Sequence, residues 1–587
     1  MSTANPEASA PLQAYRAVVP ALVRRRVAHR VPTGLRAALK RLPHRLHALG
    51  FLTRRVRVLR ARRRWPRLRT FQRGPGLAAA PGNRIAVVRA AVSPLGLREA
   101  NLERVVGALE RADIDHFVIR GTSDLRSCVA VSAADREQVA GLLGRFGTEG
   151  PVYARAYRGE SAAGRAVLCG SRQAARLARG ADVLRVGAVW SHPGGTLVLG
   201  LEHGCDLEFW QPGEDRLLAP RPNRITGEVA FGEPLITLPA GRLTSFAAPP
   251  TRPTRPVRTL AACAERLPED VRFPIDAVYT WVDGSDPAWQ RRRAAHGDEG
   301  YHAESANAAR YISRDELRYS LRALEQNAPW IRRVHLVTDR QRPAWLDEGH
   351  PRITVVDHSE IFDDPSALPT FNSHAIESRL HHIKGLSEHF LYFNDDMFLG
   401  RPVTPQDFFL SNGMSRIFFS PSQLPHGASP AGDRPVDAAG KNNRRLLRER
   451  FGTAIVHKLR HAPYALRRSV LQEIEREYAA EHRQTTYSRF RGAADLSIPS
   501  SLYHYHAYLT GRAVPSQIAF AYLDLARPEI QRRLGILLAR RDRQAFCVND
   551  TLSDGLDTDR QTVMLRAFLD AYLPVPSPFE RKEAEAR

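Results

Sequence analysis

Residues 390–393, Phe-Leu-Tyr-Phe, form an apolar run that stops at Asn394-Asp395-Asp396. A strand without a polar face is buried on both sides, which is typical of a central strand in a parallel sheet covered by helices. The acidic residues then lie at the carboxyl end of that strand. A solvated turn would explain them, and so would a metal site, because Mg²⁺ prefers hard oxygen ligands such as carboxylates.

The segments before this run alternate between strand and helix patterns. Strand patterns recur in residues 275–289, 332–339 and 352–362. Between the first two lies a helix pattern in residues 313–330, where Ser313 and Glu316 have the spacing of a capping box. Strand, helix and strand with short connections predict parallel βαβ units, so we expect an α/β fold with a mostly parallel sheet and flanking helices.

A second acidic loop follows the first of these strands. In "WVDGSD" the turn-prone residues 283–286 come directly after the apolar run. In open α/β sheets, ligands bind at the carboxyl ends of the strands. If the sheet is doubly wound, this loop lies beside Asp395 and Asp396. A polar turn is the alternative interpretation of the segment taken alone.

The whole chain is longer than one hydrophobic core supports. Its 587 residues predict at least two domains. We expect a basic arm in residues 1–80, a smaller α+β accessory domain in 84–247, a Pro-rich linker in 248–272 and a catalytic domain in 273–580. The five cysteines are scattered and odd in number, which predicts a reducing compartment without a disulfide framework.

The positive charge is concentrated in the first 80 residues. They contain 19 Lys and Arg and one acid, and so account for +18 of the net charge of +24. Val, Leu and Trp alternate with Arg there, as in a segment that lies on an anionic membrane. A nucleic-acid arm and a solvated tail are the alternatives. No secretory signal or apolar run of membrane length is found, so we expect a cytoplasmic protein, peripheral at the inner face of the membrane.

Several long motifs together resemble one family. "DAVYTWVDGSD", "RDELRYSLRALEQNAPWIRRVHLVTDRQRPAWL", "LPTFNSHAIESRLHHIKGLSEHFLYFNDDMFLGRPV", "HKLRHAPYALRRSVLQEIEREY" and "FCVNDTLSD" are similar to the conserved blocks of the Stealth family. These are sugar-phosphate transferases of bacterial capsule and exopolysaccharide synthesis. The catalytic part of the lysosomal-enzyme N-acetylglucosamine-1-phosphotransferase is similar. The resemblance covers residues 273–580 and implies a nucleotide-sugar transferase-like fold.

The resemblance implies a reaction and its partners. A nucleotide-sugar donor, expected to be UDP-linked, gives its sugar-1-phosphate to a hydroxyl of a polysaccharide acceptor. The expected cofactor is Mg²⁺ or Mn²⁺, and no nucleic acid is expected. An ordinary glycosyltransferase that releases nucleoside diphosphate is the main alternative, and a non-catalytic glycan- or nucleotide-binding protein is the second.

The site residues follow from the same motifs. As metal ligands we expect Asp395, Asp396, Asn549 and Asp550. As catalytic residues we expect Asp396, His461, His374 and Arg491. As substrate-binding residues we expect Trp281, Asp283, Gly284, Asp286, Arg318, Asn372, Glu377, Asn443, Arg444 and Arg460.

The identity of the general base stays open at this point. His is the usual base near neutral pH, which suggests His461 or His374. In the lysosomal relatives a His lies near the segment "TTYSRFRG", where this sequence has Tyr487 or Ser488.

Overall fold

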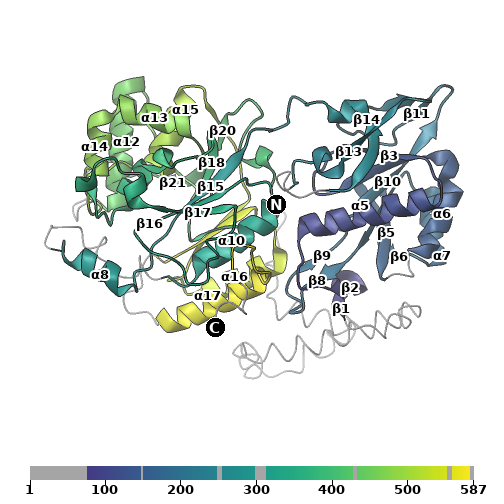
Figure 1. Ribbon diagram of the computed structural model, residues 1–587, viewed down its shortest axis with the longest axis horizontal. Coiled ribbons are helices and arrows are strands. Elements are labelled where there is room, and N and C mark those ends of the chain that lie inside the picture. The colour runs from purple at the N-terminus through teal and green to yellow at the C-terminus, as the bar shows by residue number, and fades with distance from the viewer. Residues whose placement is uncertain are drawn as a thin grey trace, which may run out of the picture.

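The structure is a computed structural model that describes residues 76–146, 150–247, 254–297, 313–427, 433–550 and 558–581. Figure 1 shows two α/β halves side by side, the amino-terminal half in purple and blue and the carboxyl-terminal half in teal to yellow. Each half has its own large hydrophobic core. Leu95 and Phe246 come from the first half but pack in the core of the second, so the two halves are in direct contact.

The amino-terminal half is built around a ten-stranded sheet with the order β13-β14-β3-β4-β10-β7-β5-β6, to which β11 and β12 are added through β10. A smaller sheet has the order β1-β2-β8-β9. The strands are β1 (Leu77–Ala80), β2 (Arg84–Val88), β3 (His116–Ile119), β4 (Ser127–Ser132), β5 (Val152–Arg158), β6 (Ser161–Leu168), β7 (Val183–Ala188), β8 (Trp190–Ser191), β9 (Val198–Leu199), β10 (Cys205–Pro212), β11 (Arg216–Leu218), β12 (Glu228–Ala230), β13 (Leu235–Pro239) and β14 (Pro256–Leu260). The helices are α5 (Pro94–Arg111), α6 (Arg136–Arg145) and α7 (Arg172–Gly180).

The carboxyl-terminal half contains a five-stranded sheet with the order β17-β16-β15-β18-β23 and smaller sheets beside it. Its strands are β15 (Ile275–Thr280), β16 (Val334–Thr338), β17 (Ile353–Asp357), β18 (His389–Asn394), β19 (Met397–Leu399), β20 (Ser415–Ile417), β21 (Phe419–Gln423), β22 (His457–Leu459), β23 (Tyr464–Arg467), β24 (Ala513–Pro515), β25 (Phe520–Asp524) and β26 (Ala545–Asn549). Its helices are α8 (Pro287–Ala294), α10 (Glu316–Asn327), α11 (Ser373–Ser378), α12 (Pro435–Phe451), α13 (Arg468–Glu477), α14 (Ala479–Thr486), α15 (Tyr503–Leu509), α16 (Ile530–Arg540) and α17 (Thr558–Tyr572).

The direction of winding in this sheet reverses between β15 and β18. The chain runs from β15 outward to β16 and β17 and then returns to β18 on the other side of β15, with these four strands parallel and only β23 antiparallel. The predicted α/β class with a mostly parallel sheet is therefore confirmed. Thr280 is the register partner of Asn394, so the loops after β15 and β18 leave the same edge next to each other. That edge is the point where ligands bind in doubly wound sheets.

The prediction of a buried central strand is also confirmed. Residues 390–393 are all 0% exposed. The aromatic rings extend this packing to the neighbouring strands, since Phe393 stacks on Tyr279 of β15 and Tyr392 on Tyr464 of β23.

Two segments differ from the sequence-based expectation. Leu77–Ala80, expected in the basic arm, form β1 and pair with β2. Pro256–Leu260, expected in the Pro-rich linker, form β14 between β13 and β3. Proline is tolerated at the first position of a strand, which is where Pro256 lies. The rest of the arm, residues 1–75, lies outside the described residues.

The expected capping box at the start of α10 is wrong. Asp315 has a left-handed backbone with φ 69°, and the helix begins one residue later at Glu316. The Glu316 carboxylate accepts the Arg314 amide at 2.5 Å instead of the Ser313 amide. Glu316 is therefore buried at the helix start, 6% exposed.

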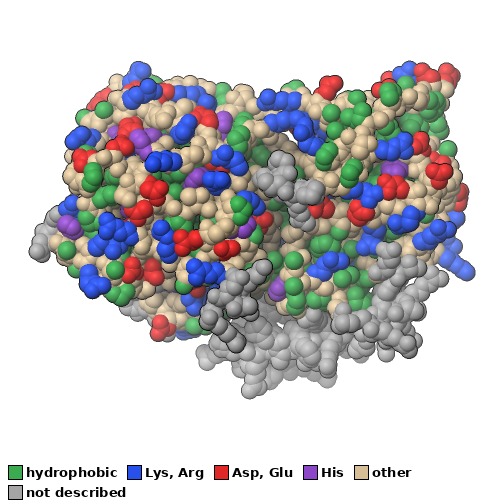
Figure 2. All heavy atoms as spheres, in the orientation of Figure 1, with side chains coloured by type: hydrophobic (Ala, Val, Ile, Leu, Met, Phe, Trp, Pro, Cys, Tyr) green, Lys and Arg blue, Asp and Glu red, His purple; other side chains and the backbone are tan. Residues whose placement is uncertain are grey.

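Other bulk features agree with the sequence. All five cysteines are free and buried, as expected. Among the described residues, no helix has the length and apolar character needed to cross a membrane. Figure 2 shows Lys and Arg side chains interspersed with Asp and Glu over the face in view.

A buried carboxylate ties β15 to the neighbouring segments. Asp276 is 0% exposed and accepts two hydrogen bonds from Arg332, at 2.8 and 2.7 Å, and one from the Ser387 amide at 2.8 Å. Burial alone would raise the pKa of Asp276, but hydrogen bonds from Arg332 and His335 outweigh it and hold the pKa below its usual value.

We expect Asp276→Ala to lower the free energy of unfolding by about 2–4 kcal/mol at pH 7, because the Ser387 amide and the Arg332 guanidinium lose their acceptor. Since the folded pKa is depressed, this contribution is complete above about pH 4, the ordinary value for Asp, and is lost as the pH falls further. Urea titrations of both proteins at pH 7 and pH 3 measure it. Glu348→Ala, at an exposed ion pair with Arg342, is the control and should change stability by about 0.5 kcal/mol or less. An equal loss from both substitutions would contradict the assignment.

Candidate functional site

The Asn-Asp-Asp turn after β18 is joined to the last conserved motif. β19 follows the turn and pairs antiparallel with β26, so that Met397 lies opposite Cys547. The Asp396 carbonyl accepts the Val548 amide at 3.0 Å, and the Cys547 thiol donates to Asp396 Oδ2 at 3.1 Å. The structure therefore brings "NDD" and "CVND" together, although about 150 residues separate them along the chain.

A third carboxylate, missed by the sequence analysis, completes an acidic cluster. Burial raises the pKa of Asp395 well above its usual range, and the charges of Glu316 and Asp396 raise it further. Burial and the Asp396 charge also raise the pKa of Glu316. Glu316, Asp395 and Asp396 are hence close enough to disfavour one another's ionised forms. This cluster is named the acidic triad below.

Asp550 reaches the triad only through an arginine. Its Oδ2 accepts from Arg314 Nη2 at 2.8 Å, and Arg314 Nη1 lies 3.8 Å from Glu316 Oε1. Asp550 Oδ1 is buried without a hydrogen-bond partner in the described structure. The Asn549 carbonyl accepts the Leu525 amide at 2.9 Å. The other two expected metal ligands, Asn549 and Asp550, thus lie next to the triad, and Asp550 is paired with Arg314.

His461 lies on the other side of Asp396. Its Nε2 is 3.3 Å from Asp396 Oδ1, and its Nδ1 is 3.2 Å from the Tyr464 hydroxyl. Burial lowers the pKa of His461, but the carboxylates of Asp396 and Glu377 outweigh burial and leave that pKa above its usual value. His461 is therefore placed to exchange a proton next to the acidic triad.

Glu377 connects His461 to the carboxyl end of β15. It is 5% exposed, and its Oε1 accepts from the Tyr392 hydroxyl at 3.1 Å, which in turn is 2.9 Å from Thr280 Oγ1. Burial raises the pKa of Glu377, while the nearby charges of His374, Arg491 and His461 oppose that rise. Three expected site residues, His374, His461 and Arg491, thus lie near one buried carboxylate.

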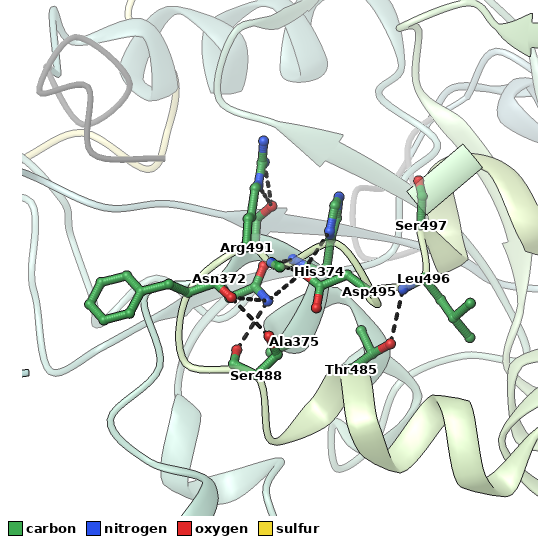
Figure 3. A network of polar contacts seen from close by, with 12 residues as sticks. Asn372, His374, Ala375, Thr485, Ser488, Arg491, Asp495, Leu496 and Ser497 are labelled. Atoms are coloured by element: carbon green, nitrogen blue, oxygen red, sulfur yellow. Dashed lines mark hydrogen bonds and ion pairs between the residues drawn. The ribbon is translucent and has the colours of Figure 1, made fainter. Parts of the chain in front are cut away.

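A polar network holds the neighbouring wall of the site, as Figure 3 shows. Asp495 Oδ2 lies 3.2 Å from His374 Nδ1 and accepts from Asn372 Nδ2 at 2.8 Å. Asn372 also donates to the Ser488 carbonyl at 3.0 Å and caps α11 through the His374 amide. The Arg491 guanidinium donates to Ser373 Oγ from Nε at 3.2 Å and from Nη2 at 2.5 Å. His374 therefore has a carboxylate that orients its ring.

The loop after β15 is held by Gln341. Gln341 accepts the Asp283 amide at 2.9 Å and donates to the Asp283 carbonyl at 2.8 Å. Asp286 caps α8 through the Ala288 amide, and the Gly284 carbonyl accepts from Gln290. Trp281 packs on the core beside them. In the described structure no contact joins this loop to the acidic triad, so its expected role in substrate binding stays a prediction.

Three other expected substrate-binding residues make local contacts within the protein. Arg318 pairs with Glu580 at 2.5 Å. Arg444 is buried and donates to the carbonyls of Ile455, Pro425 and Leu424. Asn443 donates to the Ser497 carbonyl at 2.9 Å. Asn443 Oδ1 is buried without a partner in the described structure, and the expected role of these three residues toward a substrate stays a prediction.

Arg460 is different, because it precedes His461 in the chain. Its amide donates to the Phe418 carbonyl, and its half-buried guanidinium has no hydrogen bond or ion pair in the described structure. Arg460 is thus a cation without a protein partner in the described structure, one residue before His461 in the chain.

The acidic triad has the donor chemistry that a divalent ion needs. Asp396 Oδ1 is buried and has no hydrogen bond within the described structure, although His461 Nε2 is 3.3 Å away. Three carboxylates that disfavour one another's charge are stabilised by a cation, and their oxygens are the ligands preferred by Mg²⁺. Asp396, His461 and Cys547 also offer ligand atoms within 4.8 Å of one another. Burial raises the pKa of Cys547 well above its usual range, and Mg²⁺ prefers oxygen to sulfur ligands.

Comparison with family models finds four matches in the carboxyl-terminal half. Stealth protein conserved region 1 matches residues 273–300, region 2 matches 310–417, region 3 matches 460–508 and region 4 matches 536–587. The acidic triad comes from region 2, His461 and Arg491 from region 3, and Asp550 from region 4. The described site therefore combines residues from three of the four regions.

Curated relatives extend over the whole chain. An exopolysaccharide phosphotransferase of Streptomyces coelicolor is 72% identical over 100% of both chains, and a second one from that organism is 45% identical over 98% of this chain and 99% of its own. Exopolysaccharide phosphotransferase CpsY of Mycobacterium tuberculosis is 36% identical over 86% of this chain and 92% of its own. The likeness thus includes the amino-terminal half, which the family models leave uncovered.

Among solved structures, the galactosyltransferase LgtC in complex with donor and acceptor sugar analogues aligns with 50% of this chain and 96% of its own, at 12% identity and a TM-score of 0.27. A score this low adds nothing to the argument. The identities over full-length relatives and the four matched regions decide the matter: the chain belongs to the Stealth protein family.

Proposed function

We propose that this chain transfers a sugar-1-phosphate from a nucleotide sugar, UDP-linked in the simplest case, to a hydroxyl of a glycan in exopolysaccharide or capsule synthesis. The names of its curated relatives support a phosphotransferase. The observation that carries the proposal is the acidic triad beside His461, Glu377 and Arg491 at the switch point of the parallel sheet. This edge offers a cation site, a proton acceptor and a positive charge within one group of residues.

The reaction consists of one displacement at phosphorus. The acceptor hydroxyl oxygen forms a bond to the phosphorus that carries the sugar, and the bond from this phosphorus to the bridging oxygen breaks. The products are a phosphodiester and a nucleoside monophosphate, while the hydroxyl proton passes to a base. Such transfers depend on holding the reactants in line and on neutralising phosphoryl charge.

Asp395, Asp396 and Glu316 would hold Mg²⁺ or Mn²⁺, because Asp395 and Asp396 follow β18 and the charges of Glu316 and Asp396 act on Asp395. When bound, the ion neutralises negative charge on the diphosphate of the donor. Arg491 supplies positive charge from the protein itself. Two of its nitrogens are fixed by Ser373, which leaves Nη1 for a phosphoryl oxygen. Arg460 offers a second cation for the donor or acceptor.

Of the two expected histidines, His461 is the proposed base. Its imidazole lies against Asp396, which joins it directly to the proposed cation site. His374 is buried and held by Asp495, and it acts on Glu377 through its charge. We therefore assign proton transfer to His461 Nε2 and a positioning role to His374.

Product analysis tests the reaction class. Purified full-length protein with Mg²⁺ or Mn²⁺ should release nucleoside monophosphate from one member of a UDP-sugar panel in the presence of a glycan acceptor. Release of nucleoside diphosphate would instead establish an ordinary glycosyltransferase. Binding of donor without any release would favour the non-catalytic alternative. Loss of release on adding EDTA, with recovery on adding metal, tests the cofactor.

We further propose that residues 1–73 hold the protein against the cytoplasmic face of an anionic membrane, since each Arg near such a surface contributes up to about 1 kcal/mol. Deletion of these residues should abolish sedimentation with vesicles that contain anionic lipid and leave nucleoside monophosphate release unchanged. Vesicles of neutral lipid are the control. Unchanged sedimentation after the deletion would refute the membrane role. Retention of the full-length chain on heparin alone would favour the nucleic-acid alternative.

A further inference from the structure

A cavity of about 450 Å³ lies at the amino-terminal end of α5, away from the acidic triad. Its lining includes Ser93, Gly96 and Arg98 of this helix and its cap, Trp190 of β8, and Thr254 and Arg255 from the segment before β14. Leu95, also in the lining, packs in the core of the carboxyl-terminal half. The cavity is lined by residues of the amino-terminal half, and Leu95 places it near the junction of the two halves, a common position for ligand sites.

Arg98 is the unusual residue of this cavity. Its side chain is buried, with 4% of the residue exposed, and Nε has no hydrogen-bond partner. No ion pair or hydrogen bond to Arg98 is found in the described structure. A buried charge without a partner costs several kcal/mol, so such groups are normally paired. The guanidinium therefore lacks an anion.

The carboxylates nearest to Arg98 are engaged elsewhere. Asp124 accepts from Arg224 at 2.9 Å and from the Ser245 amide at 2.7 Å. Glu103, which also lines the cavity, is hydrogen-bonded to Arg255. Glu99 lines the cavity and acts on Arg98 through its charge. The protein thus supplies negative charge near Arg98 but no carboxylate in contact with it.

Other groups in the lining suit a polar molecule with an anionic end. The 18-residue helix α5 begins here, and the amino end of a helix favours negative charge. The Trp190 indole, which is 7% exposed and stacks on the Arg89 guanidinium, adds an apolar part of the wall.

We propose that this cavity is a second binding site, specific for a small anionic molecule, with the Arg98 guanidinium on its phosphate or carboxylate group. The planar guanidinium binds both anions through two parallel hydrogen bonds, so either group satisfies the chemistry. The proposal does not depend on the transfer reaction, because none of its residues belongs to the acidic triad or its surroundings.

The test measures binding by isothermal titration calorimetry with full-length protein that carries Asp396→Ala. The buffer contains EDTA, so metal-dependent binding at the triad does not contribute. The probes are glucose 1-phosphate, glucuronate, inorganic phosphate and glucose. We expect at least one of the three anionic probes to bind about tenfold or more tightly than glucose, and the preferred one identifies the anion. Equal or absent binding of all four probes would refute the site.

Three variants locate the binding. Arg98→Gln should weaken it at least about tenfold, because the charged donor is lost. Arg111→Gln, at the exposed last turn of the same helix and outside the cavity lining, should leave it unchanged. Ala91 is exposed and lines the cavity, so Ala91→Trp should block binding without disturbing the core even if Arg98→Gln folds poorly. Parent-like affinity in Arg98→Gln or Ala91→Trp would overturn the proposal.

Discussion

Asp396→Ala is expected to lower nucleoside monophosphate release by at least about 10³-fold, since it removes a central carboxylate of the proposed cation site and the partner of His461. Asp396 interacts with Cys547 and His461 through its side chain and adds to the repulsion that raises the pKa of Asp395. Relief of that repulsion offsets the lost contacts. The free energy of unfolding should therefore change by about 1 kcal/mol or less.

The measurement combines initial rates with urea denaturation of each variant. Asp542→Ala, an exposed carboxylate on the loop before β26, is the matched control and should keep parent activity and stability. Asp396→Asn separates charge from shape, because it keeps the size of the side chain and should lose most of the activity as well. Parent-like rates in both Asp396 variants would return the Asn-Asp-Asp segment to the turn interpretation.

The position of this site followed from the sequence because it depends on one buried strand. Four apolar residues in succession require burial on both faces, and the acids after them must then lie at a strand end. The pairing of Thr280 with Asn394 adds the neighbouring loop to the same edge. Only the direction of winding had to be assumed, and the structure has the reversal between β15 and β18.

Glu316 was missed because a local motif explained it. Spacing from Ser313 suggested a helix cap, whereas the left-handed backbone of Asp315 moves the helix start and leaves the carboxylate facing Asp395. A positive φ at a non-glycine residue is not visible in sequence patterns. The signal that was present is the run Arg314-Asp315-Glu316, three charged residues before an apolar helix.

Long-range pairing explains the other differences. Asp495, which orients His374, lies 121 residues away in a segment without a recognised motif. Arg444 belongs to a basic run that suggested phosphate binding, yet its donors meet three carbonyls of the chain after β21 and before β22. Whether an arginine meets a substrate or a carbonyl depends on tertiary packing, so composition alone left both outcomes open.

For Arg98, too, the sequence alone did not show whether the side chain is solvated or buried. It lies in a helix with a good pattern, and a solvated surface arginine would have been the default expectation. The contact of Leu95 with the core of the other half buries the start of α5. Arg98 is thereby removed from water without gaining an ion pair in the described structure, which no periodicity in the sequence indicates.

The choice between the two histidines leads to the second large expected effect. His461→Gln should lower the turnover rate by about 10²–10⁴-fold, the usual contribution of a general base, with a much smaller change in the Michaelis constant for the donor. His374→Gln keeps a side chain that can still donate to Asp495, so it should retain more activity and mainly weaken donor binding through the displaced Glu377 and Arg491.

His457→Gln, at an exposed histidine in β22, controls for the loss of an imidazole. Steady-state kinetics with far-UV circular dichroism distinguish the cases, and a larger loss of turnover in His374→Gln than in His461→Gln would move the base to the histidine that Asp495 holds.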